Sequence, residues 1–212
     1  MSAAETNLPK KTLGWPKLLA ALVILAILLA GIPLLVKRLQ PHQFSGMLLQ
    51  SPDKAADFTL MSHDQQEVSL SDFRGKVVAI YFGYVSCPDI CPVTLANLRL
   101  ARNLLGEQGN DVQVLMITVD PERDTPEIMA EFIAHFDPTF IGLSGDLNQT
   151  AEIATQYGVY FEKQETSSVL GYLVDHTATV MVIDPDGYLR LVIPFGTTGK
   201  EMAADLKYIL EH

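Results

Sequence analysis

Cys87 and Cys91 are the only two cysteines in the 212-residue sequence, and three residues separate them. They lie between a short apolar run, Val77 to Phe82, and a helical pattern of apolar residues from Pro92 to Leu105. Amide dipoles at a helix N-terminus favour negative charge, which lowers the pKa of a thiol and supplies thiolate. The pair therefore predicts a reversible disulfide or a site for a soft metal. The alternative without a functional site is that both cysteines are ordinary, unrelated core residues.

His176 is the histidine best placed to join this pair. It follows Asp175 on the segment that enters the last predicted hairpin, and ligands of α/β sheets gather beyond the strand ends. It could therefore reach the cysteine loop, although an ordinary loop histidine is an equal reading of His176 alone. The other histidines have simpler interpretations. His42 lies in a tether and His212 at the chain end, while His63 lies in a solvated turn and His135 in the last turn of a helix.

The surrounding pattern alternates strands with helices. This order predicts an α/β fold, a mixed sheet with helices on both faces. Thr125 and Pro126 are typical of a helix cap and first helical position. The expected strands are 58–60, 68–70, 77–82, 112–119, 140–143, 178–183 and 188–193, with less certain strands at 159–161 and 169–173; the expected helices are 92–105, one opened by Thr125, 147–157 and 199–210.

The N-terminal part is different in kind. The segment 18–36 is 19 residues long and carries no charge. This length spans a bilayer core, and lysines flank the segment on both sides. We expect a short tail (1–17), this uncleaved transmembrane helix, a linker (37–54) and one folded domain (55–212). A cleaved signal peptide is the rival interpretation, although the apolar run is long for one.

Charge limits the partners. The chain carries −10 overall; residues 1–36 contribute +2, so the remainder carries −12. An acidic body without a basic stripe argues against nucleic acid and fits docking to a basic protein surface. Three lysines before the apolar run against Lys37 and Arg38 after it favour a cytoplasmic N-terminus with the body outside.

Three motifs in order resemble the SCO/SenC family. They are Tyr81-Phe82-Gly83-Tyr84 with Cys87-Pro88-Asp89-Ile90-Cys91-Pro92, then Thr118 to Pro126, then Asp175-His176 leading to Ile183-Asp184-Pro185-Asp186-Gly187. The likeness runs from about Asp57 to the C-terminus. Val85 departs from the family, which commonly has threonine there.

The resemblance implies a thioredoxin-like domain tethered to the membrane. Such proteins deliver copper to the binuclear CuA centre of cytochrome c oxidase, and here Cys87, Cys91 and His176 would be the copper ligands. Expected partners are the CuA-bearing subunit and possible copper chaperones or thioredoxin-like reductants. The expected location is the inner (cytoplasmic) membrane, single-pass, with the C-terminal domain on the periplasmic or extracytoplasmic side.

The residue chemistry agrees with copper. Thiolate sulfur favours Cu(I), and imidazole nitrogen lets the same site accept Cu(II). A closed structural zinc site wants four protein ligands, and no fourth is evident. Asp175 could orient His176 or could cap the loop, while Asp120 and Arg123 are expected to form a turn with a salt bridge.

Two enzyme classes compete with this metallochaperone, which would turn over no substrate. A thiol-disulfide oxidoreductase could reduce the CuA-site cysteines, but its motif usually has two residues between cysteines, and His176-Thr177 stands where a cis-proline would be expected. A thiol peroxidase of the same fold needs one activated thiol in a polarising shell, which this pair with a histidine fits poorly.

Overall fold

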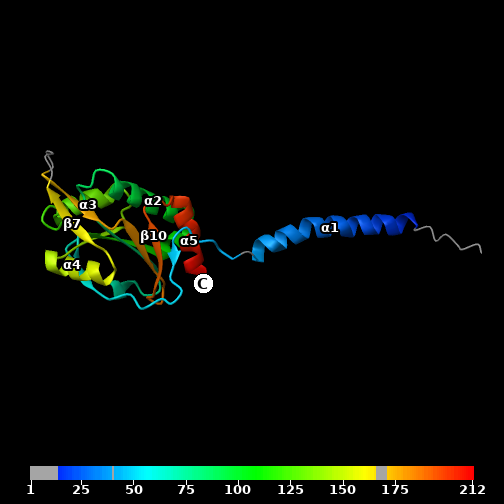
Figure 1. Cartoon of the computed structure of the whole chain (residues 1–212), viewed down its shortest axis with the longest axis horizontal. Helices are drawn as coiled ribbons and strands as arrows, with labels where there is room; N and C mark the ends of the chain where they lie inside the picture. The colour runs from blue at the N-terminus through cyan, green and yellow to red at the C-terminus, as the bar shows by residue number, and fades with distance from the viewer. Residues whose placement is uncertain (1–13, 40, 166–170) are drawn as a thin grey trace, which may run out of the picture. The chain divides into compact units, whose positions relative to one another are not determined.

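The computed structural model describes residues 14–39, 41–165 and 171–212, and the chain divides into two compact units, 1–43 and 44–212. The N-terminal unit holds one helix, α1 (Trp15–Leu39), drawn in blue in Figure 1. Within the described part of the chain, we find no helix with both the length and the apolar character needed to cross a membrane. Lys10 and Lys11 and the start of the possible strand 169–173 fall outside the described residues.

The C-terminal unit is built on a sheet of eight strands. In spatial order these are β1 (Met47–Leu48), β10 (Leu189–Pro194), β9 (Thr179–Ile183), β4 (Val77–Gly83), β5 (Val112–Thr118), β6 (Ile141–Ser144), β2 (Thr59–Ser62) and β3 (Glu67–Ser69). Strands β4, β5 and β6 run parallel, and the remaining neighbours pair antiparallel. The sheet is therefore mixed, as the order of strands and helices predicts.

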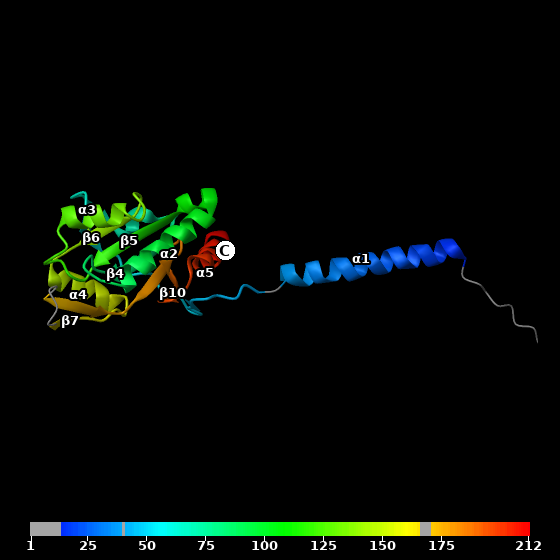
Figure 2. The ribbon, with the colours of Figure 1, turned by 90° about the horizontal axis from the view of Figure 1, so that it is seen from above.

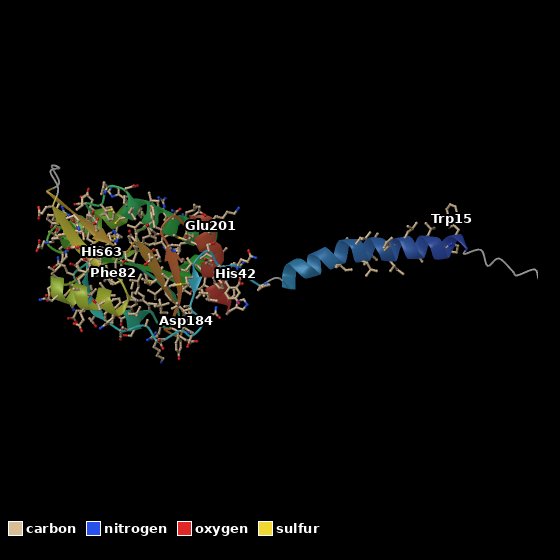
Figure 3. All side chains as sticks on the ribbon, viewed as in Figure 1. Trp15, His42, His63, Phe82, Asp184 and Glu201 are labelled. Carbon is tan, nitrogen blue, oxygen red and sulfur yellow. The ribbon has the colours of Figure 1, made fainter. Side chains whose placement is uncertain are left out.

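The central strand β4 is buried along its whole length, which requires cover on both faces. Successive strand residues point to opposite faces. The Tyr81 hydroxyl donates to Cys91 on α2 (Ile90–Leu104), whereas the ring of Phe82 packs 6.1 Å from the ring of Tyr157, which ends α4 (Leu147–Gln156). Helices α2 and α4 therefore cover opposite faces, and Phe82 lies among the packed side chains of the unit in Figure 3.

Two further helices join α2 on its face. Tyr81, Met116 and Gly142 are in register across β4, β5 and β6, and a Cβ added at Gly142 would meet Met129 of α3 (Pro126–Ala134). Helix α5 (Gly199–Glu211) lies beside α2 (Figures 1 and 2), and its first amide donates to the Asn97 side chain. This face, with three helices, is the one that carries the cysteines.

Local chemistry sets the helix starts. Thr125 accepts the Ile128 amide with Pro126 as the first helical residue, so the predicted cap is confirmed. Asp146 caps α4 in the same way, and Thr198 with Glu201 forms a capping box on α5. Two short 3-10 helices, η1 (Leu70–Phe73) and η2 (Gly106–Asp111), precede β4 and β5.

A hairpin stands apart from the main sheet. Strands β7 (Phe161–Glu165) and β8 (Tyr172–His176) pair with each other and form a separate two-stranded sheet between α4 and β9. The mixed sequence of this region gives no clear alternation, which explains why it predicts strands only loosely. His176 is the last residue of β8, so this hairpin positions it.

The expected linker is wrong for residues 44–54. Strand β1 pairs with β10, Lys54 bridges to Tyr188, and the amides of Ser45 and Gly46 donate to the carboxylate of Asp205, which is buried on α5. A two-residue strand has no alternation to read, and its partners lie about 150 residues away in the sequence. The folded unit therefore begins at Phe44.

Candidate metal centre

Cys87 and Cys91 lie where β4 passes into α2. Cys87 belongs to the loop between them and is 9% exposed, whereas Cys91 lies in the first turn of α2 and is fully buried. The Cys91 amide donates to the Cys87 sulfur across 3.5 Å. A free helix N–H is therefore directed at one sulfur, as the sequence predicts for a helix entrance.

His176 completes the group from the end of β8. Its Nε2 lies 3.5 Å from the Cys91 sulfur, and the two sulfurs and a ring nitrogen lie within 4.8 Å of one another. On the other side of the ring, Nδ1 lies 3.3 Å from the Thr177 carbonyl, which can accept a hydrogen bond from a protonated Nδ1. With the proton on Nδ1, the Nε2 lone pair is directed at the sulfurs, as metal binding requires. Without metal, a proton on Nε2 can instead be donated to the Cys87 thiolate.

Two tyrosines of the strand and loop before the cysteines enclose the histidine. The Tyr81 hydroxyl donates to the Cys91 sulfur at 3.3 Å, and the rings of Tyr81 and Tyr84 meet the His176 ring edge-on at 6.0 and 5.9 Å. The sequence places Tyr81 in the expected strand and both tyrosines in the motif that resembles the SCO/SenC family, and it gives neither a role at the metal site. The available signal is a hydroxyl inside an apolar strand, because a buried tyrosine normally requires a hydrogen-bond partner.

The two thiols are electrostatically unequal. A hydrogen bond from the Cys91 thiol lowers the pKa of Cys87 far below that of a free thiol, helped by His176 and the nearby amides and opposed by burial. The same bond, together with burial, raises the pKa of Cys91. In the reduced protein without metal, Cys87 is therefore the thiolate and Cys91 the thiol.

This asymmetry makes a prediction for the reduced, metal-free chain. Alkylation of Cys87 by iodoacetamide, followed by mass spectrometry of the modified peptide, is expected to have a pH midpoint well below about 8.5, the value of a free thiol. Cys91 is buried and protonated and should react far more slowly. A Cys87 midpoint at or above that of glutathione in the same samples would contradict the assignment.

The arrangement suits one soft metal ion. Two sulfurs and an imidazole nitrogen converge, and Cys87 retains some exposure through which a further ligand could approach. Over residues 14–39, 41–165 and 171–212 this is the only group of three or more histidine, cysteine or acidic side chains close enough to share an ion. A fourth protein ligand of those types, which a closed structural zinc site would need, is not part of the group.

A buried carboxylate, Asp124, is hydrogen-bonded to the cysteine loop. Asp124 is 1% exposed, and its Oδ2 accepts the Val85 amide at 3.0 Å and the Thr118 hydroxyl at 2.5 Å. Its Oδ1 is buried without a hydrogen-bond partner in the described structure. Burial raises the pKa of Asp124 to about 6, against the two hydrogen bonds that lower it.

The raised pKa predicts how stability depends on pH. The folded state holds the Asp124 proton up to about pH 6, whereas the unfolded chain releases it near pH 3.8. The contribution of Asp124 to the free energy of unfolding therefore falls as pH rises between those values. The loss is about 3 kcal/mol at 1.36 kcal/mol for each pH unit of pKa difference. Urea unfolding of wild type and Asp124→Asn from pH 4 to 7 should show wild type losing unfolding free energy relative to the variant as pH rises. Parallel curves would contradict it.

The remaining predicted residues lie as follows. Asp175 is exposed, and as the neighbour of His176 in β8 it points to the other side of the strand, so the contact to Nδ1 comes from Thr177 instead. Asp120 and Arg123 form the expected salt bridge. His135 caps the end of α3 as expected, but His63 is not solvated, because its Nδ1 accepts the Gly142 amide at 3.1 Å.

Comparison with known proteins gives a family match. The family model described as SCO1/SenC matches residues 47–211. The mitochondrial SCO2 homolog of Bos taurus is 39% identical over 153 residues, which cover 71% of this chain and 58% of that protein. This chain therefore spans less than two thirds of the length of that relative.

Solved structures share the fold. Apo Sco1 of Thermus thermophilus superposes with a TM-score of 0.71 at 38% identity, covering 79% of this chain and 98% of that one. Bradyrhizobium japonicum ScoI, solved with copper bound, gives 0.66 at 38% identity and covers 74% and 99%. The predicted thioredoxin-like architecture of the C-terminal unit is thereby confirmed.

Proposed function

Since this chain belongs to the SCO1/SenC family, we propose that it binds copper and delivers it to the CuA centre during assembly of cytochrome c oxidase. The observation that carries this proposal is the meeting of Cys87, Cys91 and His176 from two distant elements, with all three ligand atoms within 4.8 Å. A relative with 38% identity has been solved with copper bound. The copper is cargo, so the chain would bind and release it without turnover.

The site chemistry suits binding followed by release. Two sulfurs hold Cu(I), and His176 supplies the nitrogen that Cu(II) also accepts. Three protein ligands leave a position where a ligand of the acceptor can bind before the others leave. Cys87, the more exposed of the two cysteines and the one with the lowered pKa, is the ligand that an incoming partner would meet first.

Transfer to the acceptor tests the delivery step. Copper-loaded full-length protein, mixed with the copper-free soluble CuA domain of an oxidase, should pass its copper to that domain, measured as the copper content of the two proteins after separation. His176→Ala should deliver less, because it carries less copper. We expect at least about a tenfold loss of copper affinity in that variant, or about 1.4 kcal/mol. Copper that stays on the wild-type chain in the presence of the acceptor would overturn delivery.

A thiol-disulfide oxidoreductase is the second candidate, and the unequal thiols favour it. A sulfur activated by its lowered pKa, next to a protonated thiol, can attack a partner disulfide through Cys87 and resolve the mixed disulfide through Cys91. The chain would become oxidised and the partner would leave as a dithiol. Reduction of the oxidised CuA domain by the copper-free chain would support this role, and no reduction over hours would exclude it.

Anchoring to a membrane is a separate proposal. Its support is the sequence of residues 18–36, which are uncharged over 19 positions and flanked by lysines. The C-terminal unit would then face the periplasm, where the oxidase CuA domain would be met. The full chain should stay in the membrane pellet after alkaline carbonate extraction, whereas a chain starting at Phe44 should be soluble. Extraction of the full chain into the supernatant would contradict anchoring.

A further inference from the structure

A cluster of side chains beside the metal centre joins the segments that carry its ligands. It comes from three places: Asp120 and Arg123 after β5, Tyr172 on β8, and Tyr84 in the cysteine loop. Asp120 is fully buried and Arg123 is mostly enclosed, with 24% of its side chain exposed. None of these residues is a ligand, and turn formation explains only the pairing of Asp120 with Arg123.

Arg123 makes its contacts in two directions at once. Its Nε donates to Asp120, which fixes the guanidinium, and its Nη1 donates to the Tyr172 carbonyl at 3.0 Å. The guanidinium also lies 3.7 Å from the centre of the Tyr172 ring and 5.8 Å from the centre of the Tyr84 ring. Arg123 thus lies between the hairpin and the cysteine loop and contacts both.

The hairpin is fastened to the same turn by further bonds. The Tyr172 hydroxyl donates to the second oxygen of Asp120 at 2.8 Å, and Lys163 on β7 pairs with Glu122 at 2.6 Å. The Val174 amide donates to the Tyr84 hydroxyl at 3.3 Å. These bonds tie the separate two-stranded sheet of β7 and β8 to the loops around the cysteines.

Strand geometry links this fastening to the ligand. Tyr172, Val174 and His176 alternate along β8 and therefore point to one side of it. That side faces the cysteine loop, because Tyr84 contacts both Val174 and the His176 ring. Tyr172 lies four residues from His176, about 13 Å along the strand. Holding Tyr172 in place thus sets the position from which His176 reaches the sulfurs.

We propose that Arg123, oriented by Asp120, is a positioning residue that clamps the β7–β8 hairpin so that His176 stays within reach of Cys87 and Cys91. The inference rests on the proposed copper binding and adds a residue that controls its nitrogen ligand. Lysine cannot replace arginine here, because it has neither a planar fork for two acceptors nor a flat face for two rings. The positive charge by itself is therefore not sufficient.

The test compares two arginine-to-lysine variants in the full chain. Arg123→Lys keeps the charge and loses the fork. Arg102→Lys is the matched control: Arg102 pairs with Asp137 at 2.7 Å, donates to the Gly109 carbonyl and lies 5.6 Å from the Phe140 ring centre, with 11% of its side chain exposed. Both variants lose an arginine network, but Arg102 contacts none of the three ligands.

Copper(II) sulfate is the probe, and electron paramagnetic resonance of the loaded protein is the main readout. Arg123→Lys should give a second signal with weaker nitrogen coupling, matching the signal of His176→Ala, and about a tenfold lower Cu(II) affinity, the size found when groups orienting a ligand are removed. Arg102→Lys should give the wild-type signal and affinity with a lower unfolding midpoint. In a His176→Ala background, Arg123→Lys should lower copper affinity no further.

A second variant, Tyr172→Leu, keeps the test valid if Arg123→Lys misfolds. Tyr172→Leu removes the ring that Arg123 covers and acts from the hairpin side, so it should reproduce the second signal. Wild-type spectra and affinity in both Arg123→Lys and Tyr172→Leu would overturn the clamp while leaving copper binding intact. An equal loss in Arg102→Lys would also overturn it, because the effect would then follow stability alone. If wild type itself binds no copper, the proposed function fails, and the clamp fails with it.

Discussion

Replacing Cys91 by serine is expected to lower Cu(I) affinity by at least about a hundredfold, or about 2.8 kcal/mol. The serine hydroxyl is a hard ligand that Cu(I) binds poorly, and Cys91 lies within 3.5 Å of both other members of the site. The fold should survive, because the Tyr81 hydroxyl that donates to the sulfur can donate equally to a serine oxygen. Competition with a Cu(I) chelator under anaerobic conditions measures the affinity.

Ala101→Ser provides the control for that substitution. It also places a serine on the buried face of α2, but near the other end of the helix. Its Cu(I) affinity should equal that of wild type even where its unfolding free energy is lower. A Cys91→Ser chain that retained wild-type affinity would remove Cys91 from the ligand set.

Replacing Gly83 by alanine is expected to damage the fold and the metal site together. An added Cβ would lie 2.6 Å from Cε1 of Tyr81 and 3.1 Å from the Cys91 sulfur, and both neighbours are fully buried. The Tyr81 ring cannot yield without moving its hydroxyl from Cys91 or its edge from His176. We expect a loss of about 1–3 kcal/mol in unfolding free energy, the usual cost of overpacking. We also expect weaker Cu(I) binding.

Gly142→Ala separates the two consequences. Its Cβ would lie 2.3 Å from Cγ of Met129, so it also overpacks a strand glycine against a helix, but no ligand is involved. Methionine is flexible, and the variant should lose stability while its copper affinity stays at the wild-type value. Urea unfolding and chelator competition on both variants give the comparison. Unchanged copper affinity in a folded Gly83→Ala protein would show that the packing behind the sulfurs does not position them.

Much of this fold can be read from the sequence, because its central elements have strong patterns. The apolar run before the cysteines, the Thr125-Pro126 helix start and the turn at Asp184-Pro185-Asp186-Gly187 all lie where local chemistry predicts, the last with Gly187 at φ +87°. The cysteine pair follows from the same logic, since a strand that passes into a helix fixes both sulfurs. These features depend on neighbours within a few residues.

Features that depend on distant contacts could not be predicted. The β7–β8 hairpin is held by Arg123 and Tyr84, which come from other parts of the chain. Its own residues therefore show no clear strand pattern. Strand β1 pairs with β10, and the two amides just before it donate to Asp205 on the last helix, so its contacts are all distant in sequence. Likewise, the distance between His176 and Cys91 is set by tertiary packing across 85 residues. The position of His176 before the last hairpin made it a candidate, and the family resemblance was needed to favour it over an ordinary loop histidine.

X-ray absorption of the reduced full-length chain loaded with one Cu(I) tests the central claim most directly, when wild type is measured beside His176→Ala. Our account predicts two sulfur scatterers and one nitrogen scatterer in wild type, and loss of the imidazole signature in the variant. Identical spectra from the two proteins would contradict it. His176 would then be no ligand, and the copper would be held by the two cysteines without it.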